Sequence, residues 1–253
     1  VQMVTKLIKH ELYAIGRVIV YFAVALLGVA VLMRIMFAVA PASPFSGLLL
    51  LLYVYAVLAM LISAFWLSIA RFYRPLFTGE GYFTLSMPVT ADQLIWSKLL
   101  SAIVAEAFAV VVCVLSGCIF LIGLDNAVLT EIWLVLSEAF SQLGLIMQYD
   151  PLYIVEIICL FLTSLPMNLL IFYLILSLAQ LCTNHRIGMA FLIGFAFSMG
   201  LSIVNTCILI PVFMVIPSPH AAIWVQIILN LVVDVACFLI VRYILRNKVN
   251  LIV

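Results

Sequence analysis

Charged residues are scarce in this sequence, with 11 Lys and Arg and 10 Asp and Glu among its 253 residues. Hydrophobic residues make up 68% of the chain, more apolar surface than a water-soluble domain of this size can bury. The charges nearly balance, at a net +1, so no basic surface for nucleic acid is expected. The sequence therefore predicts a membrane protein that does not bind nucleic acid.

Motifs for nucleotide binding and catalysis are missing as well. None of the 11 glycines opens a G-x-x-x-x-G-K-[ST] phosphate loop, and no H-E-x-x-H or G-x-S-x-G pattern occurs. The three histidines, His10, His185 and His220, lie on different connections, with no Cys or acid at metal-ligand spacing. We therefore expect no enzyme activity, cofactor or metal on this chain itself.

The six cysteines all fall inside or at the edge of apolar segments, where a disulfide is not expected. They are predicted to act as small hydrophobic residues. These are Cys113, Cys118, Cys159, Cys182, Cys207 and Cys237.

The few charges separate six apolar segments, each long enough to cross a hydrocarbon core of about 30 Å as a helix. No apolar and polar alternation is present, which favours helices over the strands of a barrel. The predicted fold is all-α, a polytopic membrane protein with one transmembrane domain over residues 1–253. The six predicted spans are Arg17–Ala40, Ser46–Ala70, Lys98–Leu124, Leu152–Cys182, Ile187–Pro211 and Ala222–Ile244.

The distribution of Lys and Arg predicts the orientation. With a cytoplasmic N-terminus, 10 of the 11 basic residues lie on the cytoplasmic side, and only Arg34 lies near the outer face. The connection after the third span instead carries acids, which are Asp125, Glu131, Glu138 and Asp150. We therefore expect both termini in the cytoplasm.

Two further segments are amphipathic. Residues 1–15 are predicted to form an interfacial helix on the cytoplasmic leaflet, in contact with lipid. Residues 125–151 are predicted to rest on the outer surface. For both segments, a purely structural role is an equal alternative.

The cytoplasmic connection over residues 71–97 is long and too aromatic for a disordered loop. A short helix over Glu80–Ser86 would expose aromatic and aliphatic side chains and end before Pro88. Thr90 would then cap the next helix, with Gln93 as its capping-box partner. This compact projection suits docking into a groove of a partner protein, and the alternative is an interfacial helix that lies on lipid.

The run from Glu80 to Thr90, followed by Gln93–Lys98, resembles the membrane subunits of ABC exporters of the ABC-two type, especially small permeases of Firmicute-type bacteria. It lacks the longer Glu-rich run that often precedes this helix in the family. The resemblance implies a coupling helix that contacts an ABC ATP-binding subunit, which would hold ATP and Mg²⁺. The implied contact residues are Glu80, Gly81, Tyr82, Phe83, Leu85 and Pro88.

The resemblance also implies how the whole complex is composed. A second permease copy or paralogue would complete it in the bacterial plasma membrane. Its substrate would be a hydrophobic or amphipathic peptide, lipid or drug, moved by alternating access. The alternatives are a secondary transporter driven by an ion gradient and an accessory membrane subunit that does not transport.

Polar residues inside the predicted spans are candidates for a translocation pathway. The alternative for each is a contact that holds neighbouring helices together. Glu156 and Arg34 both lie toward the outer side, where they could approach each other, and Asn168 marks a kink next to Pro166. The full set is Asp234, Glu106, Asn168, Asn205, Glu156 and Arg34.

Overall fold

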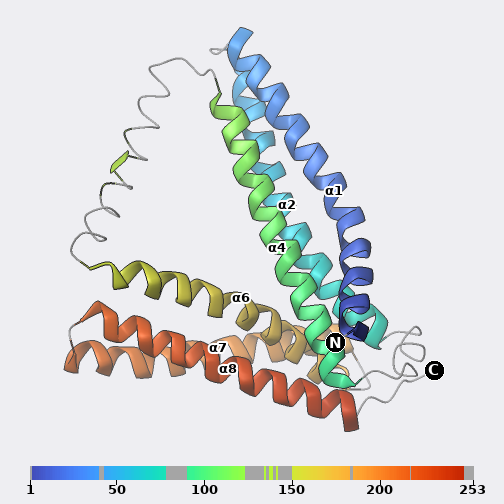
Figure 1. Cartoon of the computed structure of the whole chain (residues 1–253), viewed down its shortest axis with the longest axis vertical. Helices are drawn as coiled ribbons and strands as arrows, with labels where there is room; N and C mark the ends of the chain where they lie inside the picture. The colour runs from blue at the N-terminus through green and yellow to red at the C-terminus, as the bar shows by residue number, and fades with distance from the viewer. Residues whose placement is uncertain are drawn as a thin grey trace. The chain divides into compact units, whose positions relative to one another are not determined.

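The computed structural model describes residues 2–39, 43–77, 90–122, 134, 137, 138, 141, 150–182, 185–216 and 218–247. Within these ranges the chain forms long helices and no strand (Figure 1). They are α1 (Gln2–Val39), α2 (Pro44–Phe77), α4 (Ala91–Leu121), α6 (Leu152–Ala179), α7 (Arg186–Val215) and α8 (Pro219–Asn247). All 6 are long and apolar enough to cross a membrane. The predicted all-α, multi-pass fold is confirmed to this extent.

Several helices continue beyond the predicted spans. α2 runs past the predicted end at Ala70 to Phe77, and α4 begins at Ala91, before the predicted start at Lys98. Arg, Lys and Gln are good helix formers, so they end an apolar run without ending a helix. The predicted coupling segment is therefore helical at both ends. Its residues Glu80, Gly81, Tyr82, Phe83, Leu85 and Pro88 lie outside the described residues.

α6 and α7 each contain a proline and continue through it. α7 runs through Pro211 to Val215, four residues beyond the predicted end of the fifth span. α6 likewise passes through Pro166 without a break. A single proline removes one backbone hydrogen bond, and membrane-spanning helices tolerate that loss when neighbouring groups satisfy the freed carbonyl.

α1 is continuous from Gln2 to Val39. The predicted interfacial segment over residues 1–15 is therefore not separated from the first span by a turn, and its described part forms the first turns of the same helix. Its position at a membrane surface stays a prediction, as does that of the outer segment over residues 125–151, most of which lies outside the described residues.

The chain forms two compact units. The amino-terminal unit comprises Thr5–Ser68 and Leu100–Leu145, and holds α1 with most of α2 and α4. Its core is built from alanines and aliphatic side chains, which allow close helix approach. These core residues are Ile15, Ile19, Ala23, Leu26, Met60, Ala64, Ala105, Ala109 and Val112.

The carboxyl-terminal unit comprises Val1–Val4, Ile69–Leu99 and Ile146–Val253. In it α6 packs most extensively against α8, and α7 contacts both (Figure 1). The last turns of α2 join this unit through Phe72, whose ring stacks on the ring of Tyr173 from α6 with centroids 3.8 Å apart. Both rings are fully buried. The six cysteines, all within the described part of the chain, are free.

Candidate functional site

The start of α4 carries the predicted capping box. The backbone N–H of Gln93 donates to Thr90 Oγ1 at 3.4 Å, and the backbone N–H of Thr90 donates to Gln93 Oε1 at 3.3 Å. These reciprocal bonds satisfy donors that the first helical turn leaves free. The capping prediction is confirmed, and the capping box fixes where α4 begins.

The two helices that flank this segment are joined by a buried lysine. Lys98 on α4 is only 3% exposed, and its Nζ donates to the backbone carbonyl of Arg71 on α2 at 2.7 Å. Burying an ammonium group is costly unless hydrogen bonds compensate it. The contact therefore holds the end of α2 against the first turns of α4, at the base of the segment over residues 78–89.

The first turn of α4 is also joined to the last turns of α8. Arg242 Nε lies 2.8 Å from Asp92 Oδ1, as an ion pair whose alignment falls short of a hydrogen bond. Nearby, the rings of Trp96 and Phe238 lie with centroids 5.6 Å apart. Both side chains of the ion pair are partly exposed, so its contribution to stability is small, but it fixes which part of α8 meets α4.

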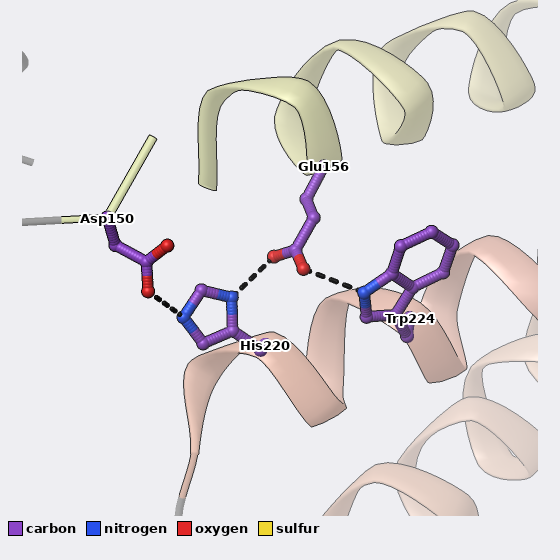
Figure 2. A network of polar contacts seen from close by, with 4 residues as sticks. All are labelled: Asp150, Glu156, His220 and Trp224. Atoms are coloured by element: carbon purple, nitrogen blue, oxygen red, sulfur yellow. Dashed lines mark hydrogen bonds and ion pairs between the residues drawn. The ribbon is translucent and has the colours of Figure 1, made fainter. Parts of the chain in front are cut away.

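A second group of polar contacts lies where α6 and α8 begin, and we call Asp150, Glu156, His220 and Trp224 the His220 cluster. His220 Nδ1 lies 2.8 Å from Glu156 Oε2, and His220 Nε2 lies 2.7 Å from Asp150 Oδ2. Trp224 Nε1 donates to Glu156 Oε1 at 2.7 Å. Figure 2 shows His220 between the two carboxyl groups, which approach opposite sides of its ring. Glu156 itself is only 4% exposed.

A third set of contacts lies further along the same two helices. Gln226 Nε2 donates to Asn230 Oδ1 at 2.9 Å, and Asn230 Nδ2 donates weakly to Thr163 Oγ1 at 3.5 Å. Asn230 is buried, and the contact with Thr163 joins α8 to α6. The interface between α6 and α8 therefore contains polar contacts at two positions along the helices.

The remaining pathway candidates are not brought together into one site. Asn168 donates to the carbonyl of Ser164 on its own helix at 3.0 Å, which favours the structural alternative. One side-chain oxygen each of Glu106, Asn205 and Asp234 is inaccessible and accepts no hydrogen bond from the described residues. Such oxygens are costly in an apolar environment and keep these three residues as functional candidates.

Within its own unit, Glu156 has two partners. Both oxygens of Glu156 accept or share hydrogen bonds with His220 and Trp224. Arg34 belongs to the other compact unit, so its approach to Glu156 stays a prediction. These two partners of Glu156 were not predicted. The only signal was that His220 and Trp224 are four residues apart and so lie on one face of a helix.

Among the described residues, no group of three or more His, Cys, Asp and Glu side chains is placed to hold a metal ion. In the His220 cluster the two carboxyl groups lie on opposite sides of the imidazole, so the three side chains do not converge on one point. Comparisons with protein-family models, curated proteins and solved structures found no match to this chain.

Proposed function

We propose that this chain is the permease subunit of an ATP-driven ABC exporter in a bacterial plasma membrane. The observation that carries the proposal is the construction around the segment over residues 78–89. The sequence of this segment resembles the coupling helix of such permeases, and the described residues on either side of it are held by a capping box and by the bond from Lys98 to Arg71.

This construction suits the transmission of movement. A segment seated in a cleft of an ATP-binding subunit would move when two such subunits close on ATP and Mg²⁺. Because Lys98 joins α4 to α2, both helix ends would move together. The ion pair from Asp92 to Arg242 and the stack of Phe72 on Tyr173 would carry the displacement to α8 and α6. The chain itself would hydrolyse no ATP.

In this proposal two permease copies, identical or paralogous, pair with two ATP-binding subunits. The cargo is a hydrophobic or amphipathic peptide, lipid or drug. Glu106, Asn205 and Asp234 are the polar residues proposed to face the pathway, because each has an inaccessible oxygen without a hydrogen bond from the described residues.

The test is a cross-link between position 82 and an ATP-binding protein. A photoreactive phenylalanine analogue replaces Tyr82 in the full chain, expressed in its native membrane, and the partner is identified by labelling with a photoreactive ATP analogue. We expect one ATP-labelled adduct, which Glu80→Lys reduces at least severalfold. The matched control is Glu138→Lys, the same charge reversal in the predicted outer connection, which should leave the adduct unchanged.

Insertion into the membrane should be the same for all variants, as measured by the yield of intact protein in the membrane fraction. A cross-link only to lipid, or equal loss of the adduct in both charge-reversal variants, would contradict the proposal.

The second candidate is a carrier driven by a proton gradient. The specific observation that favours it is the His220 cluster, because proton-coupled carriers use acids and histidines within their spanning segments. Transport that stops when the proton gradient is collapsed at constant cellular ATP would favour this candidate. Transport that stops only on ATP depletion would favour the exporter.

A further inference from the structure

The two contacts of His220 in the cluster require more protons than a neutral imidazole carries. An ionised carboxylate only accepts hydrogen bonds, and a neutral imidazole has one N–H and one lone pair. Both ring nitrogens of His220 lie within 2.8 Å of a carboxylate oxygen. Each of these two contacts therefore needs a proton between nitrogen and oxygen. A neutral imidazole between two ionised carboxylates would place its lone pair against one of them.

The two contacts differ in their surroundings. The Glu156 side chain is 5% exposed and also accepts a hydrogen bond from Trp224, so its charge lies in the interior of the unit. A buried carboxylate without a counter-charge costs several kcal/mol, which favours retention of the proton on the nitrogen facing Glu156. The side chains in the other contact, His220 and Asp150, are 33% and 42% exposed. That contact is screened by solvent and is the weaker of the two.

Few other described groups face the imidazole. On α6, the ring of Tyr153 meets it edge-on, with centroids 5.7 Å apart. α8 has no other ionisable residue before Asp234. α7, which contacts both helices, has no acid, His, Lys or Tyr after Arg186, and its Cys207 thiol is exposed. Asp150 and Glu156 are therefore the charges that decide the protonation of His220 among these elements.

The position of Asp150 shows which parts of the chain are joined by its contact with His220. Asp150 lies two residues before the start of α6, and its carbonyl accepts the backbone N–H of Tyr153, in the first turn of that helix, at 3.1 Å. His220 lies in the first turn of α8. The contact between Asp150 and His220 therefore joins the chain just before α6 to the first turn of α8.

We propose that Asp150, Glu156 and His220 form a proton-binding site, and that the bound proton fastens the start of α6 to the start of α8. Loss of the proton leaves the N–H on the side of Glu156 and a lone pair facing Asp150. The carboxylate of Asp150 then separates from the ring, while the buried contact with Glu156 remains. The site does not depend on the proposed ATP-binding partner. In the predicted orientation it senses the pH outside the cell.

The test is solid-state NMR of the full chain in liposomes, with ¹⁵N-labelled histidine and ¹³Cγ-labelled aspartate. The chain has only three histidines, and the ¹⁵N shifts report whether each ring nitrogen carries a proton. The ¹³C–¹⁵N dipolar coupling reports the contact between Asp150 and His220. Over a pH series from about 5 to 9, we expect His220 to change from doubly to singly protonated, with loss of this coupling in the same pH range.

Two isosteric variants provide the controls. Asp150→Asn removes the labelled carboxyl group and should abolish the coupling, which assigns it. His185→Gln alters a histidine outside the cluster and should change neither the coupling nor its pH dependence.

Three results would each overturn the proposal. They are a coupling that persists after His220 becomes neutral, a His220 that is neutral at every pH, and a coupling that is absent at every pH. Wild-type protein alone decides among these outcomes, so the test stands even where a variant fails to fold.

Discussion

In the amino-terminal unit α1, α2 and α4 meet through alanines and aliphatic side chains, whereas in the carboxyl-terminal unit α6 and α8 also meet through ionisable and amide side chains. In the amino-terminal unit a polar contact also joins two helices, from Tyr53 on α2 to Ser116 on α4, at 3.1 Å. Lipid tails are as apolar as leucine, so helices in a membrane gain little from the hydrophobic effect. Close packing holds the first set of helices together, and polar contacts fix the alignment of the second.

Polar contacts between helices cost desolvation and give specificity only when their partners are in place. A charged group held this way can change its partners when a proton binds or leaves, which an alanine contact cannot do. The contacts between helices that include an imidazole and carboxyl groups therefore join α6 to α8 in the carboxyl-terminal unit, whereas the core of the amino-terminal unit is apolar.

The largest expected effect concerns the aromatic stack of Phe72 on Tyr173. Tyr173→Ala leaves a large cavity in a fully buried position, which typically costs about 3–5 kcal/mol. Unfolding in mixed detergent and SDS measures this loss of stability. The comparison variant is Tyr53→Ala in the amino-terminal unit, where the stack on Phe120 is looser at 6.0 Å and the loss should be smaller.

Tyr173→Phe serves as the control, since it keeps the ring and should retain most of the stability. Equal losses for the two alanine variants would remove the distinction between the two stacks.

The next effect concerns the buried carboxylate of Glu156. Glu156→Ala leaves the ring nitrogen of His220 and the indole N–H of Trp224 without their acceptor, which costs about 2–3 kcal/mol. The same unfolding measurement applies, at a pH near 6 where His220 is protonated in the proposal. Glu156→Gln keeps an acceptor for Trp224 and should lose less. An unchanged stability in Glu156→Ala would show that the cluster does not hold α6 to α8.

The smallest effect concerns the contact of Tyr53 with Ser116. Ser116→Ala removes one neutral hydrogen bond between helices, worth on average about 0.6 kcal/mol in a membrane. Asn230→Ala, at the buried polar position on α8, provides the comparison in the other unit. A loss for Ser116→Ala as large as that for Glu156→Ala would erase the difference between the units.

The six helices were predictable because a membrane requires long apolar runs with internally bonded backbones, and such runs are visible in the sequence. The capping box of Thr90 and Gln93 was predictable because it depends on residues only three positions apart. The helix ends were less accurate. Hydropathy indicates where a segment leaves the lipid, and a helix can extend beyond that point. α2 continues past Arg71 to Phe77, and α4 begins at Ala91, before its apolar run.

The partners of the buried polar groups were not predictable. Glu156 and His220 are 64 positions apart, and Lys98 and Arg71 are 27 positions apart. No local spacing rule connects residues at such separations. The charge of Glu156 indicates that it needs a partner, but it does not identify which distant residue supplies one.

Composition and local pattern by themselves determined that this chain is a helical, multi-pass membrane protein. Helix formation and membrane insertion both depend on the hydrophobicity and length of each short segment. Only the packing of α6 against α8 decided that one imidazole lies between two carboxyl groups, and only the packing of α4 against α2 decided where the charge of Lys98 is satisfied. The physical reason is that desolvation is a property of each residue, whereas compensation for it depends on which distant residue the fold brings within hydrogen-bonding distance.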